Sequence, residues 1–316
     1  MKTVSIITTA YNAERFIANA IHSVNQQITS EHFNIEYVIV NDVSTDNTLN
    51  VVENYFKNNP TTLNLKILTP ENNLGCGGAR RYGIEHATGD FFMFLDADDY
   101  YINKDFVKRA FETLVFDEAD IVEYGVIFNQ ISGNQQVQHV REKMIVTDPE
   151  VAELLLFNEN IIKFNVWTKI YRRSIVESFA YSDERTFEDV RTIPIWIKNA
   201  KKIIIMPSSE INYRAAANSI IRENVIKTRL GTITAIASLF EKFSDKPAIL
   251  KSMYKRSMID LEAVLNNHSS NDEGFNEMSR LNTYMLSYIY PNTYKEITYH
   301  VEDDEEINSK NKKEEV

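Results

Sequence analysis

Three absences limit what this chain of 316 residues can be. It has one cysteine, Cys76, so no disulfide forms within the chain, and that usage suits a reducing compartment. No apolar run approaches membrane-spanning length, and the opening apolar segment is too short for a signal peptide. Basic residues number 34 against 45 acidic ones, and the net charge of −11 disfavours broad nucleic-acid binding. These absences predict a cytoplasmic protein with at most peripheral membrane contact.

A short apolar run at residues 91–95 ends abruptly on the carboxylates Asp96, Asp98 and Asp99. Because turn residues precede it, we predict a buried central strand of a parallel sheet. Asp96 and Asp98 are two residues apart and point to one side at the sheet's carboxyl edge, where open α/β sheets bind ligands. Mg²⁺ and Mn²⁺ prefer carboxylate oxygens completed by water and phosphate. We therefore predict Asp96 and Asp98 as metal ligands beside a diphosphate-bearing substrate.

The alternative for these aspartates is a solvated strand end that leads into a helix cap. Under that interpretation Asp99 or Asn103 begins a helix over residues 104–118.

Strands alternate with helices upstream of this run. Residues 4–9, 37–40 and 65–68 predict strands, and each is followed by a loop and a helical pattern. Ser44 or Thr45 is expected to cap the second helix. This alternation predicts an α/β fold with a mostly parallel central sheet flanked by helices.

Four blocks in series resemble the inverting family 2 glycosyltransferases, which have the GT-A fold. The blocks are residues 4–7 with 11–14, 40–42 with 44–46, 73–75 with 78–80, and 87–90 continuing through 96–99. The resemblance implies a nucleotide-sugar donor, usually linked to UDP, and Mn²⁺ or Mg²⁺ as cofactor.

Carried onto matching positions, the resemblance implies that Tyr11 stacks on the nucleotide base, Asp42 accepts a hydrogen bond from it, and Arg80 faces the donor. The full set of implied donor-binding residues is Ala10, Tyr11, Asn12, Glu14, Asp42, Asn73, Gly75, Arg80, Asp96, Ala97 and Asp98. This pair suits a nucleotide base, because an aromatic ring can stack on the base and a carboxylate can accept a hydrogen bond from its imide N–H. The alternatives are that Tyr11 packs under a loop, Asp42 caps a turn and Asn12 caps the first helix.

The glycine-rich segment 75–78 precedes a helical pattern, so its backbone N–H groups are expected to approach a phosphate. Two residues depart from the family pattern. Arg81 stands where asparagine is usual, which affects contacts to the diphosphate, and Val43 replaces the usual glycine, which suggests a different loop conformation.

Glu188 and Asp189 match the Glu-Asp pair of the resembled family, in which the aspartate is the general base. An inverting transfer needs one carboxylate within reach of the acceptor hydroxyl. Asp189 is the predicted base, with Glu188 as second candidate; the alternative is that both acids complement a helix dipole. In the flanking segments, Trp167 is either a sugar platform or core, and Lys169 and Arg214 either meet an anion or are solvated charges.

Helical spacing of apolar residues continues after the Glu-Asp pair and its flanks. We predict a glycosyltransferase domain over 1–222, with donor and metal binding in 1–100 and the acceptor side in 101–222. A helical region over 223–300 is a possible homo-oligomer contact, and the acidic tail 301–316 is predicted to be disordered.

The predicted function is metal-dependent inverting transfer of a sugar to a hydroxyl of a glycan, surface polymer, glycolipid (lipid-linked) or protein acceptor. Two alternatives from other classes are a nucleotidyltransferase, which would release pyrophosphate, and a catalytically silent sugar-nucleotide binder. Glycosylation of modified DNA is a minor branch of the first hypothesis, because nucleic acid is an unfavoured partner for so acidic a chain.

Overall fold

The computed structural model describes residues 1–129, 135–214, 225–265 and 273–290. The chain divides into two compact units, Met1–Asn224 and Val225–Val316, which are described separately. The predicted tail 301–316 lies outside the described residues, as do parts of the predicted helical region 223–300. Within the described ranges, no helix combines the length and the apolar character needed to cross a membrane.

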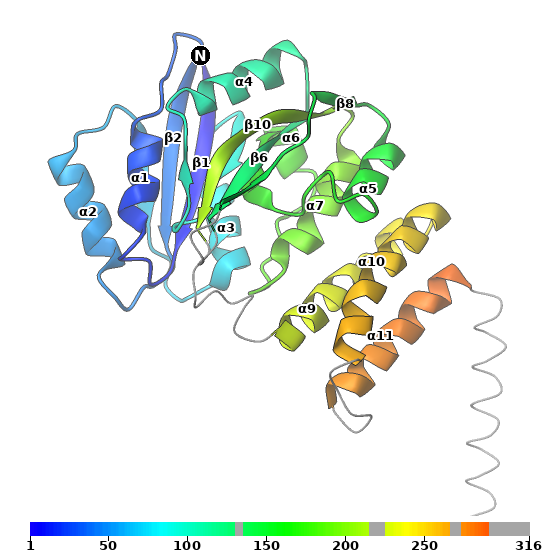
Figure 1. Cartoon of the computed structure of the whole chain (residues 1–316). Coiled ribbons are helices and arrows are strands. Elements are labelled where there is room, and N and C mark those ends of the chain that lie inside the picture. The colour runs from blue at the N-terminus through cyan, green and yellow to red at the C-terminus, as the bar shows by residue number, and fades with distance from the viewer. Residues whose placement is uncertain (130–134, 215–224, 266–272, 291–316) are drawn as a thin grey trace, which may run out of the picture. The chain divides into compact units, whose positions relative to one another are not determined.

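The first unit alternates strands and helices along the chain (Figure 1). Its strands are β1 (Lys2–Ala10), β2 (Phe33–Asn41), β3 (Asn64–Leu68), β4 (Phe91–Phe94), β5 (Tyr100–Tyr101), β6 (Ile121–Asn129), β7 (Gln135–Gln138), β8 (Met144–Val146), β9 (Lys169–Arg172) and β10 (Ile203–Arg214). Its helices are α1 (Ile17–Asn25), α2 (Thr48–Asn58), α3 (Gly75–His86), α4 (Phe106–Phe116), α5 (Pro149–Phe157), the 3-10 turn η1 (Val166–Thr168), α6 (Arg173–Val176) and α7 (Glu188–Asn199).

All ten strands form one sheet, in which the main order is β3-β2-β1-β4-β9-β6-β10-β5. Pairing is parallel from β3 through β4 and between β6 and β10. Strand β9 runs antiparallel between β4 and β6, and the short strands β5, β7 and β8 also pair antiparallel. The predicted α/β fold is therefore present, with its parallel part concentrated in the β-loop-α units of the first hundred residues.

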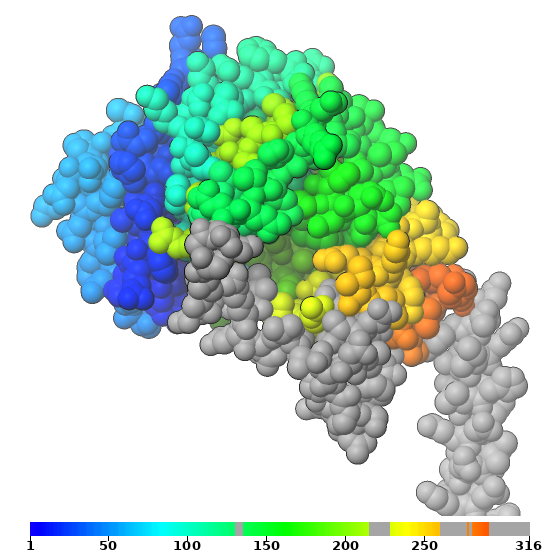
Figure 2. All heavy atoms as spheres, viewed as in Figure 1, coloured from blue at the N-terminus to red at the C-terminus, as the bar shows by residue number. Residues whose placement is uncertain are grey.

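The sheet is covered by amphipathic helices, as the periodicity of the sequence predicts. In α1 the buried residues Ile17, Ala20, Ile21 and Val24 recur at helical spacing. Helix α3 packs on β1 and β2, and α1 packs on β5 and α2. In Figure 2 the blue atoms of α1 and the lighter blue atoms of α2 form one continuous surface, consistent with that packing.

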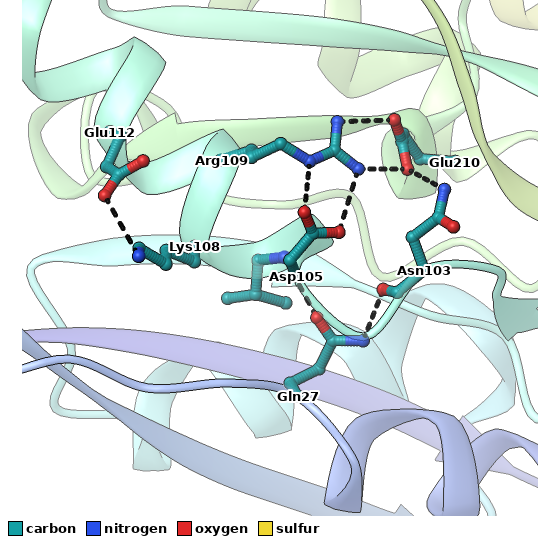
Figure 3. A network of polar contacts seen from close by, with 8 residues as sticks. Gln27, Asn103, Asp105, Lys108, Arg109, Glu112 and Glu210 are labelled. Atoms are coloured by element: carbon teal, nitrogen blue, oxygen red, sulfur yellow. Dashed lines mark hydrogen bonds and ion pairs between the residues drawn. The ribbon is translucent and has the colours of Figure 1, made fainter.

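The connection after β4 is held by a polar network rather than by a helix cap (Figure 3). The Arg109 guanidinium donates two hydrogen bonds of 2.8 Å to the carboxylate of Glu210, and it also contacts Asp105. Gln27 donates to the carbonyl oxygen of Asn103 and accepts from the amide of Val107 at 3.0 Å. This network ties α1, α4 and β10 together around β5, directly after the aspartate cluster.

The helix-cap alternative for the aspartates is wrong. Helix α4 begins at Phe106, and its N-terminal flanking residue Asp105 makes no capping bond. Asn103 instead donates to Glu210 at 3.0 Å, while Asp99 is fully buried and accepts a hydrogen bond from the Arg214 amide. Neither side chain caps α4, because each is engaged by β10.

The described residues of the second unit form the helices α9 (Val225–Ala237), α10 (Pro247–Leu265) and α11 (Glu273–Ile289), with the 3-10 turn η2 (Glu241–Phe243). The three helices pack against one another. Ile233, Ile236 and Phe240, which recur at helical spacing in the sequence, are fully buried, as is Met285. The hydroxyl of Tyr254 donates to Asn282 at 2.9 Å, so this tyrosine joins α10 to α11, consistent with a packing role.

Candidate active site

The predicted metal ligands lie where β4 ends at the carboxyl edge of the parallel strands. The Leu95 amide still pairs with the Ile7 carbonyl of β1 at 3.0 Å, and the chain then turns as the Asp99 amide donates to the Asp96 carbonyl. Asp96 and Asp98 stay partly exposed, while Ala97 and Asp99 are buried. A turn, rather than a continued strand, thus leaves the two predicted ligands partly exposed.

Three carboxylates, those of Asp96, Asp98 and Asp99, crowd together just after β4. Burial, followed by repulsion from Asp96, raises the pKa of Asp98 to about 6. Burial, followed by repulsion from Asp96 and Asp98, raises the pKa of Asp99 well above its usual range. One of the carboxylate oxygens of Asp99 has no hydrogen-bond partner. Crowded carboxylates of this kind are stabilised when a cation joins them.

The residues fit a divalent cation that shares its ligands with a substrate. Asp96 and Asp98 supply hard oxygen ligands, which Mg²⁺ and Mn²⁺ prefer. Among the described residues, no group of three or more His, Cys, Asp or Glu side chains is arranged to hold an ion alone. The remaining coordination positions therefore fall to water and to phosphate oxygens.

Arg80 connects this cluster with the Glu-Asp pair. Arg80 is 5% exposed, and its guanidinium donates to Asp96 at 2.5 Å and also to Glu188. A longer contact of 3.4 Å reaches the hydroxyl of Tyr181. The resemblance implies that Arg80 faces the nucleotide-sugar donor. In the structure its N–H groups instead point to Asp96, just after β4, and to Glu188 of α7.

Glu188 and Asp189 form the first turn of α7, but they differ in environment. Glu188 is buried against Arg80, while Asp189 keeps part of its surface exposed. Loss of hydration, followed by repulsion from Glu188, raises the pKa of Asp189 to about 7. A partly exposed residue whose carboxylate has a pKa raised toward neutrality has the properties of a general base.

The loop after β1 is fastened to the loop after β2. The side-chain oxygen of Asn12 accepts from the Thr45 amide at 2.8 Å, and Glu14 accepts from the Asn47 amide at 3.0 Å. Asn12 therefore does not cap α1, and α2 begins at Thr48 without a cap from Ser44 or Thr45.

Tyr11 lies at the edge of the loop after β1. It is 54% exposed, so it does not pack under a loop. Ala10, the last residue of β1, is buried.

Asp42 joins the second block to the third. Its two carboxylate oxygens accept from the amides of Leu74 and Gly75 at 2.7 and 2.9 Å, at the start of α3. Asn73 donates to the Asp42 carbonyl at 2.7 Å. Val43 adopts a φ of +58°, so this loop takes the left-handed conformation that favours glycine although it carries a β-branched residue.

The glycines of α3 have a packing role. The helix begins at Gly75 rather than after the glycines, and Gly77 and Gly78 are buried in its first turn. A Cβ on Gly77 would lie 2.4 Å from the carbonyl oxygens of Ser182 and Glu184. These glycines permit the segment before α7 to approach α3, and the Leu74 and Gly75 amides bind Asp42 rather than pointing at open space.

Gly77→Ala is expected to destabilise the protein by about 1 to 3 kcal/mol, because the clash is with two backbone carbonyls that cannot rotate away. Urea unfolding of the variant measures this loss. Glu85→Ala, on the exposed side of the same helix, is the control and is expected to change stability by at most a few tenths of a kcal/mol. Equal stability of the two variants would contradict the packing role of Gly77.

Of the three flanking residues, Trp167 and Lys169 are structural. Trp167 is buried and stacks on Tyr213, with ring centroids 5.6 Å apart. Lys169 is 1% exposed, donates to backbone carbonyls at 2.7 and 2.8 Å, and pairs with Glu123, so it is neither a solvated charge nor open to an anion. Arg214 places its guanidinium over the Phe16 ring.

Sequence reasoning missed two residues that shape the site. Tyr181 contacts Arg80, and Arg185 donates to the side chain and carbonyl of Asn73 at 2.9 and 3.1 Å. No local pattern marks either residue, since each acts on a segment about a hundred positions earlier. Arg81, by contrast, points to Asp183 and Glu85 on the surface.

The hydrogen bonds described above join all four sequence blocks and the Glu-Asp pair into one site at the carboxyl edge of an α/β sheet. This combination is that of a domain suited to an anionic nucleotide ligand and a divalent cation. The chain belongs to glycosyl transferase family 2, whose sequence profile matches residues 5–180. The predicted family is thus confirmed.

Relatives of known name support the same family. EpsH of Bacillus subtilis (strain 168) is 32% identical over 181 residues, which are 57% of this chain and 49% of EpsH. TarS of Staphylococcus aureus (strain Mu50), named poly(ribitol-phosphate) beta-N-acetylglucosaminyltransferase, is 34% identical over 179 residues, which are 56% of this chain and 29% of TarS. These alignments span half or less of each relative.

Solved structures confirm the fold. The crystal structure of S. aureus TarS 1–349 in complex with UDP-GlcNAc matches with a TM-score of 0.60 and 21% identity over 91% of each chain. The mannosyltransferase PcManGT from Pyrobaculum calidifontis, in complex with GDP-Man and Mn²⁺, matches with a TM-score of 0.56 and 15% identity, covering 92% of this chain and 87% of PcManGT. At these identities the likeness establishes the GT-A fold.

Proposed function

We propose that this protein is a metal-dependent inverting glycosyltransferase that moves a sugar from a UDP-linked donor to an acceptor hydroxyl. The observation that carries the proposal is that one buried arginine, Arg80, binds both Asp96, two residues before Asp98, and Glu188, the neighbour of Asp189. Family membership and the UDP-GlcNAc complex of TarS support a UDP-linked donor. A Mn²⁺-containing structural neighbour supports a metal.

The proposed donor site uses the residues of the first three blocks. Exposed Tyr11 offers a ring face for the nucleotide base, and the loops around it are fastened by Asn12, Glu14 and Asn73. The implied bond from Asp42 to the base stays a prediction, since both its carboxylate oxygens already hold the start of α3. Asp96 and Asp98 would hold the cation, which neutralises charge on the departing diphosphate.

Asp189 supplies the other half of the chemistry. Its carboxylate accepts the proton of the acceptor hydroxyl as the C–O bond to the sugar forms and the bond to the diphosphate breaks. One base on the face opposite the leaving group gives inversion, so an α-linked donor yields a β-linked product.

The proposed acceptor is a glycan, a surface polymer, a lipid-linked saccharide or a protein. Similarity to TarS, which is named for a ribitol-phosphate polymer, favours a surface polymer.

The proposed compartment is the cytoplasm, where a lone thiol remains reduced. Burial raises the pKa of Cys76 far above its usual range, so this thiol is unsuited to act as a nucleophile.

A panel of nucleotide sugars with Mn²⁺, Mg²⁺ or chelator tests the proposal by thermal stabilisation and by release of nucleoside diphosphate. We expect one UDP-sugar to stabilise the protein and to be turned over slowly in water, and chelator to abolish both effects. Pyrophosphate release from nucleoside triphosphates would favour a nucleotidyltransferase. Donor binding without turnover, even with acceptors added, would favour a silent binder.

A further inference from the structure

The buried pair of Arg80 and Glu188 joins parts of the site that are 108 residues apart in sequence. One guanidinium nitrogen of Arg80 donates to Glu188 at the start of α7, and another donates to Asp96 at the end of β4. The side chains of Arg80 and Glu188 are 6% and 7% exposed. Glu188 is therefore enclosed and engaged, whereas its neighbour Asp189 retains an exposed surface.

The turn that carries both acids is held from several sides. Phe187, just before α7, has a φ of +58°, a left-handed conformation that a bulky residue keeps only when surrounding contacts fix it. The Thr192 hydroxyl donates to the Glu188 carbonyl at 2.8 Å and accepts from the Ser182 amide at 3.0 Å. Gly77 leaves room for this turn, since a Cβ there would lie 2.9 Å from the Cβ of Glu188.

We propose that Glu188 is a positioning residue rather than a second base: it holds Arg80 between α7 and β4, and so fixes Asp189 beside the donor-side carboxylates. This inference rests on the proposed function, in which Asp189 receives the proton. A buried acid bound to arginine has no path to an acceptor hydroxyl, while the fixed first turn of α7 sets where Asp189 lies.

The arrangement also has an electrostatic consequence. The negative charge of Glu188 raises the pKa of Asp189, and the Arg80 guanidinium lowers it. The other titratable groups that face Asp189 are Asp96, Lys169, Tyr171 and Tyr181. Removing the charge of Glu188 while keeping its shape is therefore expected to lower the pKa of Asp189.

Glu188→Gln tests this, because glutamine keeps an oxygen for Arg80 but loses the charge. A base must be deprotonated, so the rate of donor turnover at pH 6 relative to pH 8 is expected to rise about two- to tenfold. Glu184→Gln, which removes an exposed acid of the same segment, is the matched control and is expected to leave the profile unchanged. An unchanged profile in Glu188→Gln would overturn the proposal, as would complete loss of turnover in this variant with turnover kept in Asp189→Asn.

Carboxyl ¹³C NMR follows the titration of Asp189 directly, with its signal assigned from the loss in Asp189→Asn. We expect a midpoint near 7 in the unmodified protein and a lower one in Glu188→Gln. This readout needs no donor. If no donor is turned over, the proposed function fails, while an unchanged NMR midpoint would overturn the positioning role separately.

Glu188→Asp provides a second variant if Glu188→Gln does not fold. The shorter acid keeps the charge but releases Arg80, so the titration midpoint of Asp189 is expected to stay raised. Because Asp189 is then less well fixed, kcat is expected to fall at least tenfold without a matching change in donor affinity. An unchanged kcat in a folded Glu188→Asp variant would contradict the positioning role.

Discussion

Asp189→Asn is expected to reduce donor turnover about 10²- to 10⁴-fold while leaving donor binding intact. Asparagine keeps the size of the side chain and its contact near the Val190 amide but cannot accept the proton of the acceptor. The measurement is kcat for nucleoside diphosphate release, together with the dissociation constant of the donor by calorimetry.

The pH profile gives this prediction a second readout. In the unmodified protein the rate is expected to rise with pH through a value near 7, because Asp189 acts only when deprotonated. The residual rate of Asp189→Asn is expected to lose that rise. Asp183→Asn, an exposed acid of the preceding segment, is the control and is expected to behave like the unmodified protein. Full turnover in Asp189→Asn would contradict the assignment of the base.

Asp98→Asn is expected to abolish the metal-dependent part of donor binding. The amide oxygen is a weaker ligand than the carboxylate, and Asp96 alone then remains beside an arginine that already engages it. Donor with Mn²⁺ is expected to raise the melting temperature of the unmodified protein but no longer that of the variant. Metal-dependent stabilisation that persists in the variant would remove Asp98 from the ion's ligands.

The same substitution is expected to stabilise the protein when no ligand is bound. Because burial and Asp96 raise the pKa of Asp98 to about 6 in the folded state, above its usual 3.8, its contribution to stability is present below 3.8 and is lost as pH rises through 6. At pH 8 the folded protein therefore carries an unfavourable charge that Asn removes, worth about 1 to 3 kcal/mol. Thermal unfolding at pH 8 measures this gain, which is expected to vanish near pH 4.

The sequence predicts the carboxyl edge of the sheet well because the signals there are local. An apolar run that ends in aspartates predicts a buried strand, and β4 is buried, with Asp96 and Asp98 partly exposed just after it. That these two aspartates bind a metal stays a prediction. The helical spacing that marks Ile233 and Phe240 likewise predicts their burial. In each case one element's own periodicity decides which side chains face the core.

Contacts between residues far apart in the sequence cannot be predicted from local periodicity. Whether Arg80 faces the donor or binds Glu188 depends on where α7 packs, and the approach of α7 depends on Gly77 and on a left-handed Phe187. Lys169 carries a sequence signal for anion binding, yet β9 pairs between β4 and β6 and buries it against Glu123. A side chain's role is set by the segment opposite it, which local patterns do not specify.

The most direct test of inverting transfer is to follow the sugar released when the unmodified protein slowly hydrolyses its α-linked UDP-sugar in the presence of Mn²⁺. Real-time ¹H NMR of the anomeric proton distinguishes the first-formed anomer before the free sugar equilibrates in water. A single base at Asp189, on the face opposite the diphosphate, predicts that the β-anomer and UDP appear together. First appearance of the α-anomer, or release of pyrophosphate in place of UDP, would contradict the account.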